Sequence, residues 1–99
     1  MALLAILSQE LCDDKSGNVF AITRVNHDGG TNTVEVPSGI STATNQVAVI
    51  PEDDSLTAPT VSSVSQAAYP SSATVTITGG GAGHFRLVTR HVGNPAGLG

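Results

Sequence analysis

The sequence predicts an all-β protein, namely a small antiparallel β-sandwich or barrel-like domain with an N-terminal arm and an extended C-terminal tail. Three observations favour this class. Apolar residues alternate with polar ones over short runs, which is the period of a strand with one buried face. Asp-Gly and glycine-rich segments that suit tight turns separate these runs. The composition is 39% hydrophobic and 12% charged, so Ser, Thr, Asn and Gly supply most of the polarity.

The clearest strand pattern lies at residues 73–92, which we expect to form a β-hairpin. Its first half alternates Val and Ile with Thr, so that one face is apolar. After the glycine-rich residues 79–83, Phe85 and Leu87 alternate with Arg86. Glycines supply the positive φ angles that a tight connection needs. We therefore assign two antiparallel strands joined by a glycine turn.

A second hairpin is expected at residues 18–37. Phe20 and Ile22 face one side of its first strand, and smaller apolar residues face the other side. A strand that is apolar on both faces is typical of one covered on both sides, here by a second sheet and by a neighbouring subunit. The Asp28-Gly29 turn signal follows, and a second alternating strand completes the pair.

The whole chain, residues 1–99, is predicted to form one domain, because its length is typical of a single domain. The leucine spacing near the N-terminus also fits a helix, but the β character of the remaining chain favours an extended segment. The remaining assignments are an N-terminal arm or strand at residues 1–11, a strand at residues 47–50, an extended linker or edge strand at residues 56–72, and a tail at residues 93–99.

The core of this domain must be light. Aromatic residues make up 3% of the chain and Trp is absent, so Val, Ile, Leu and Ala must fill the interior. A domain of this size buries only about two-thirds of its unfolded surface. We expect association with other subunits to supply part of the stability. The single cysteine, Cys12, excludes an internal disulfide framework and a cysteine-rich zinc site, and we expect it to be a small buried residue.

The charges are segregated along the chain. All eight carboxylates precede residue 55, whereas residues 55–99 carry only Arg86 and Arg90. With so few charges this could be chance, or it could create complementary faces that meet between subunits. Four residues apart on one strand, the two arginines share a face, where they would contact an acidic partner surface. The net charge of −4 argues against nucleic-acid binding.

No pattern points to catalysis, a cofactor or a metal, and we expect none of them. No serine lies in a nucleophile-elbow motif, and the acidic turns lack calcium-loop spacing. His84 and His91 are seven apart on one predicted strand, so they face opposite sides and are expected to be surface residues; His27 is the remaining histidine. The longest apolar run, Ala2 to Leu7, is far too short to span a membrane, and no membrane partner is expected.

Two resemblances bear on the fold and function. Residues 59–65 read PTVSSVS and residues 73–81 read ATVTITGGG, a pattern that resembles the opening of bacterial immunoglobulin-like modules of the IPT/TIG kind. This match covers residues 59–81 only, so the strand order of those modules is not carried over. In its general character the chain also resembles the small head-decoration (cement) proteins of tailed bacteriophages. Those are short, aromatic-poor and cysteine-poor β proteins rich in Ala, Gly, Thr and Val.

The second resemblance implies a non-enzymatic structural protein of a virion. Such a protein would be a homo-oligomeric decoration or cement subunit on the capsid surface that stabilises contacts between major capsid proteins. Its expected interface residues are Leu3, Leu4, Leu7, Arg86, Arg90 and Leu98.

Two alternatives stay open. One is an immunoglobulin-like adhesive or carbohydrate-binding module, in which Tyr69 would contact a sugar because Phe20 and Phe85 are expected inside. The other is a filament or tube subunit whose open sheet edges pair with those of neighbouring copies.

Overall fold

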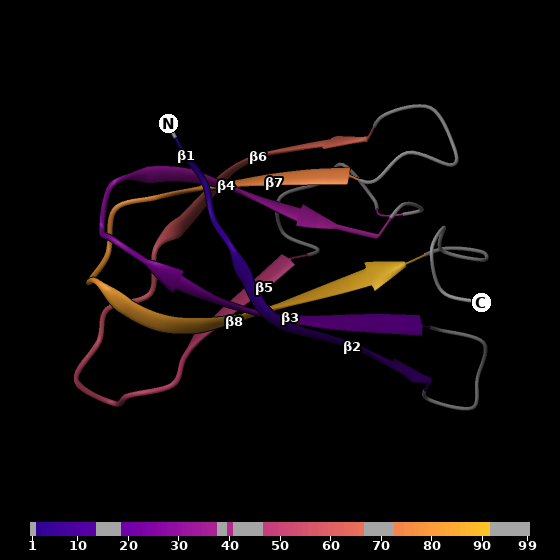
Figure 1. The fold of residues 1–99 in the computed structure, drawn as a ribbon, viewed down its shortest axis with the longest axis horizontal. Helices are drawn as coiled ribbons and strands as arrows, with labels where there is room; N and C mark the ends of the chain where they lie inside the picture. The colour runs from indigo at the N-terminus through magenta and orange to yellow at the C-terminus, as the bar shows by residue number, and fades with distance from the viewer. Residues whose placement is uncertain (1, 14–18, 38–39, 41–46, 67–72, 92–99) are drawn as a thin grey trace.

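A computed structural model describes residues 2–13, 19–37, 40, 47–66 and 73–91, and these form two four-stranded β-sheets packed together (Figure 1). Sheet A has the order β1-β4-β7-β6 and sheet B the order β2-β3-β8-β5. The predicted all-β class and small β-sandwich are confirmed, and the barrel-like alternative is not, because the sheets do not close into a barrel. The strands are β1 (Ala2–Leu3), β2 (Ile6–Asp13), β3 (Val19–His27), β4 (Thr31–Val36), β5 (Val47–Pro51), β6 (Thr60–Gln66), β7 (Ala73–Thr78) and β8 (Gly83–His91).

Consecutive strands form arches between the two sheets. In each of the pairs β1–β2, β3–β4, β5–β6 and β7–β8, one strand lies in sheet A and the other in sheet B. The two sheet orders match, so these four arches stack side by side. Neighbouring strands are antiparallel except for β1, which runs parallel to β4 through Ala2 and Leu3.

The two predicted hairpins are therefore wrong in their pairing. Residues 18–37 and 73–92 each supply two strands and a turn, but the two strands of each segment lie in opposite sheets. Every one of these strands has an apolar face, and an arch buries two such faces against each other across the core. A glycine turn serves an arch as well as a hairpin; Gly29 and Gly79 have φ values of 89° and 78°.

The core consists of the inward faces of both sheets. Val75 and Ile77 are fully buried and alternate with threonines, and Val34 and Val36 lie on either side of the exposed Glu35, as predicted. Phe85 is the buried aromatic residue of this core. The other buried apolar residues are Ala21, Val25, Ile40, Val47, Val64, Ala73 and Leu87.

The N-terminal segment belongs to both sheets. The amide of Leu4 donates to the Thr33 carbonyl at 2.9 Å, and the chain then crosses from sheet A to pair along β3 as strand β2 (Figure 1). The chain thus runs along one open side of the sandwich. The predicted strand at residues 47–50 corresponds to β5, and the segment at 56–72 contains the edge strand β6. The predicted tail at residues 93–99 lies outside the described residues.

Candidate interaction surface

The outer face of sheet B is apolar at its centre. Ala21 and Thr23 of β3 are fully buried, so Phe20 and Ile22, which alternate with them, point outward and are partly exposed. The strand register places Ile22 beside Val88 of β8, and Val88 beside Ala48 of β5. We call the residues Phe20, Ile22, Ala48, Ile50 and Val88 the outer patch. Phe20 is thus not in the core as expected, because the strand alternation turns it to the other face.

An ion-pair group borders the outer patch. The guanidinium of Arg24 donates from Nε to Glu52 Oε2 at 2.8 Å and from Nη2 to Oε1 at 2.9 Å. Arg86 Nε lies 3.7 Å from the same carboxylate. The hydrogen bond from Arg24 lowers the pKa of Glu52 and raises that of Arg24. The amide of Glu52 donates to the His84 carbonyl at 3.1 Å, which fixes the start of the acidic segment at residues 52–54 beside β8.

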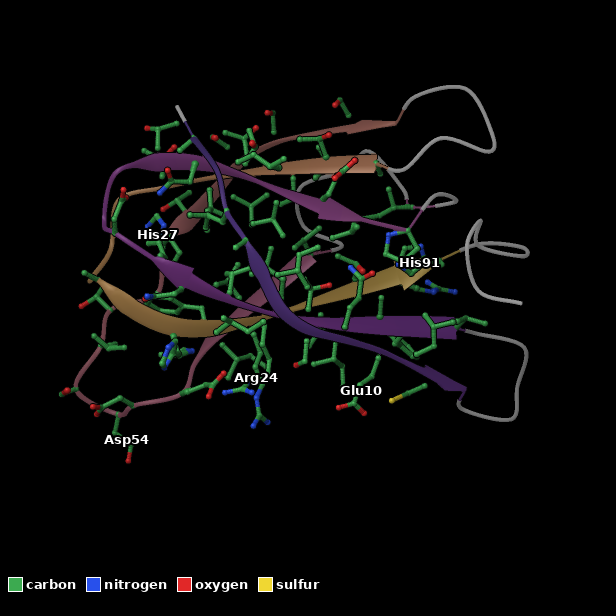
Figure 2. All side chains as sticks on the ribbon, in the orientation of Figure 1. Glu10, Arg24, His27, Asp54 and His91 are labelled. Atoms are coloured by element: carbon green, nitrogen blue, oxygen red, sulfur yellow. The ribbon has the colours of Figure 1, made fainter. Side chains whose placement is uncertain are left out.

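The two predicted arginines share the outer face of sheet B. Arg86 and Arg90 are exposed and lie on either side of Val88 along β8. The sequence pattern alone placed neither Glu52 nor Glu10 on this face. Glu10 is exposed, pairs in register with Ile22, and points away from sheet A, as Arg24 does (Figure 2). The alternation of Glu10 with Leu11 indicates an outward side chain, but only the pairing of β2 with β3 places it beside Ile22.

The predicted N-terminal interface residues divide into two groups. Leu3 and Leu7 are 62% and 49% exposed, whereas Leu4 packs against the core. Leu7 lies where the pairing of β2 with β3 shifts register, a β-bulge that turns its side chain out of the regular alternation. Ile6 beside it is 40% exposed. Leu98 lies outside the described residues.

His27 is part of a buried hydrogen-bond network at one end of the sandwich (Figure 2). Its Nε2 donates to the Gly79 carbonyl at 2.7 Å, because a carbonyl oxygen can only accept. Its Nδ1 accepts from Asn32 Nδ2 at 3.1 Å, and the same amide donates to Asp28 Oδ1 at 2.7 Å. The bond from Asn32 is the main cause of the lowered pKa of Asp28. With both ring nitrogens engaged, His27 is a structural residue.

Two other expectations about exposure are corrected. His91 is 1% exposed and bonds through Nε2 with Thr89 Oγ1 at 2.8 Å, since it continues the inward face of β8. His84 is exposed as expected, so the two histidines do face opposite sides. Cys12 is exposed rather than buried, because it pairs in register with the outward-facing Phe20.

The described residues line an open surface depression but contain no cluster of metal ligands. Within the part of the chain that the structure describes, no three His, Cys, Asp or Glu side chains gather to hold a metal ion. An open depression is lined by Ile50, Pro51, Glu52 and Arg86, at the border of the outer patch. Tyr69, the aromatic residue expected to contact a sugar, lies outside the described residues. Of the two phenylalanines expected inside, Phe85 is buried and Phe20 is partly exposed.

Comparison with known proteins adds no relative. No protein-family model matches the chain, and no curated protein or solved structure matches it either. A search of the described residues for a long apolar helix able to cross a membrane finds none.

Proposed function

We propose that this chain is a non-enzymatic structural subunit that binds the surface of a viral capsid as a decoration or cement protein. The observation that carries the proposal is the position of the exposed apolar side chains. Among the described residues, three of the four exposed large hydrophobic residues, Leu3, Ile6 and Leu7, lie on β1 and β2. They therefore gather where the chain crosses from one sheet to the other.

The same side of the sandwich has open strand edges. β2 is the edge strand of sheet B, and β1 covers only Asn32 and Thr33 of β4 in sheet A. Unpaired main-chain groups on an edge can add a strand or loop from a partner, and neighbouring apolar side chains give such a contact its specificity. The partner that suits this side is a capsid subunit with an exposed strand and an apolar groove.

Each contact of this kind would be weak. The three side chains are about half exposed, so burying each one contributes on the order of 1 kcal/mol. A capsid repeats its surface many times, and a subunit that bridges two such sites gains avidity without new contacts. Weak, repeated binding across joints is the mechanism by which a cement protein would stabilise a shell. The light, aromatic-poor composition also matches the character of known head-decoration proteins.

The test starts from virus particles purified from the source of the gene. Mass spectrometry should find the chain in many copies per particle, and particles stripped of it should rebind the purified protein. Leu7→Asp should clearly weaken rebinding, because it places a charge at the proposed contact. Thr76→Asp is the matched control, since it adds the same charge to the outer face of sheet A. Particles that lack the chain, or equal rebinding by both variants, would overturn the proposal.

A filament or tube subunit remains a second candidate, favoured by the open edge of β2. A filament subunit would polymerise alone through that edge, whereas a decoration subunit needs the capsid. Electron microscopy of the concentrated pure protein separates these possibilities. Long polymers that Leu7→Asp abolishes would favour the filament.

A further inference from the structure

We propose that two copies of this chain pack face to face through Phe20, Ile22 and Val88 of the outer patch of sheet B, about a two-fold axis that runs along β3, with β5 at the rim of the contact. In this dimer Glu10 of each copy lies between Arg86 and Arg90 of the other. The pairing uses a different surface from the β1–β2 side and does not depend on capsid binding.

The first argument is the chemistry of the two outer faces. The outer face of sheet A presents threonines and Glu35, which water solvates well. The outer face of sheet B instead carries Phe20, Ile22 and Val88 in partly exposed positions at its centre, with Ile50 48% exposed beside them. A contiguous apolar face of this kind is typical of an interface. Face-to-face packing of two sheets with nearly aligned strands is a common way to cover one.

The second argument comes from the strand register. Across the strands, one row of outward residues reads Glu10, Ile22, Val88 and Ala48, at the usual interstrand spacing of about 4.8 Å. Glu10 and Val88 thus flank Ile22 at equal distances. A half-turn about β3 exchanges these two positions, so Glu10 of one copy comes to lie over Val88 of the other.

Charge complementarity then identifies the occupant as a second copy. Arg86 and Arg90 lie on either side of Val88, each about 6.7 Å along β8 by strand rise. A carboxylate over Val88 is within reach of both guanidinium groups. Within the described part of the chain, no hydrogen bond or ion pair involves the side chain of Glu10. In the dimer, Glu10 of each copy gains the two arginines of the other copy as partners, because a two-fold contact is reciprocal.

The residues on the axis are compatible with this arrangement. Phe20 and Ile22 would meet their own copies, which buries the most apolar part of the face. Arg24 would also approach its own copy, but Glu52 already neutralises it through two hydrogen bonds of 2.8 and 2.9 Å. Arg86 lies farther from the same carboxylate, at 3.7 Å, so the two arginines and Glu52 together keep one net positive charge for Glu10 of the other copy.

The test is a charge swap read by sedimentation velocity from about 1 µM to 1 mM, where a weak dimer is populated. The wild type should form a concentration-dependent dimer. Glu10→Arg alone, and Arg90→Glu alone, should each raise the dissociation constant at least about tenfold, because each one opposes like charges. The double variant should recover part of the lost affinity, because the pair between positions 10 and 90 is restored with its charges exchanged while Arg86 still opposes the new cation. Glu35→Arg is the matched control, since it makes the same change on the outer face of sheet A, and it should have no effect.

A crosslink checks the position of the axis. In a Cys12→Ser background, a short bis-maleimide should crosslink Ile22→Cys into a dimer, because face-to-face sheets lie about 10 Å apart, a distance too long for a direct disulfide. The same reagent should not crosslink Thr76→Cys on the outer face of sheet A. A wild type that stays monomeric up to about 1 mM would overturn the proposal, as would a dimer that Glu10→Arg leaves unchanged. Rebinding of Glu10→Arg to stripped particles is measured separately, so failure of the dimer is distinguishable from failure of capsid binding.

Discussion

Two neighbouring glycines in the turn between β7 and β8 allow backbone strain to be separated from steric clash. Gly79 and Gly80 both have positive φ, at 78° and 73°. A Cβ atom at Gly79 would have no heavy atom within 4 Å. A Cβ at Gly80 would lie 2.6 Å from the Thr57 carbonyl oxygen and 2.7 Å from the Pro59 nitrogen. These are backbone atoms, so they cannot move aside as the end of a flexible side chain can.

The expected costs follow from this difference. Gly79→Ala pays only for the left-handed backbone, about 1–2 kcal/mol. Gly80→Ala has the same backbone cost and must in addition displace the segment that leads into β6, which lowers the free energy of unfolding by about 1–3 kcal/mol more. The displaced segment is held in place because the amide of Gly81 donates to the Thr57 carbonyl at 2.9 Å. The turn between β7 and β8 therefore fixes the entry to β6.

The free energy of unfolding of both variants is measured by urea denaturation followed by circular dichroism. The midpoint should fall for Gly79→Ala and fall clearly further for Gly80→Ala, with the slope of the transition unchanged. Equal losses of unfolding free energy would refute the reasoning. They would mean that the contact between this turn and residues 57–59 does not constrain the loop in solution.

Three further predictions concern single residues. Asn32→Leu should lower the free energy of unfolding by about 1–3 kcal/mol, because it leaves the buried Nδ1 of His27 without a donor; Thr76→Val on the outer face should change it little in the same urea assay. The pKa of Asp28 is lowered in the fold, so its contribution to stability is present above about pH 4, the range of an unperturbed aspartate, and is lost as pH falls through its folded value. The free energy of unfolding should therefore fall less steeply with decreasing pH in Asn32→Leu than in the wild type. Parallel curves would contradict the role of the hydrogen bond from Asn32 to Asp28. Cys12 should react with a thiol reagent in the native protein nearly as fast as in urea, and strong native protection of the monomer would contradict its exposure.

The sequence was sufficient to predict which side of most strands faces the core. The period of two placed Val34, Val75 and Ile77 inside and put Arg86 on the outer face, and the structure confirms each of these. It could not distinguish a hairpin from an arch, because both bury the same alternating residues and both tolerate the same glycine turns. That choice depends on which strands pair, and the long register of β3 on β8 joins residues far apart in the chain.

The charged part of the interaction surface was only half predictable for the same reason. Arg86 and Arg90 share a face whatever their neighbours are, so the spacing alone was enough. Glu10 and Glu52 reach that face through the pairing of β2 with β3 and of β5 with β8. The exposure of Cys12 was missed in the same way, because only the register shows that it lies beside Phe20.

The stacked arches give the sandwich two unlike sides. The arch β5–β6 lies at one side, where β5 ends in Pro51 and β6 is interrupted by a bulge near Ser62, both of which discourage the addition of another strand. The arch β1–β2 lies at the opposite side, where Leu3 and Leu7 are exposed and β1 is only two residues long. A protein that avoided all contact would protect both sides. We therefore expect Ser62→Asp to leave association unchanged and Leu7→Asp to weaken it, and a reversal of this order in particle rebinding would place the contact on the β5–β6 side.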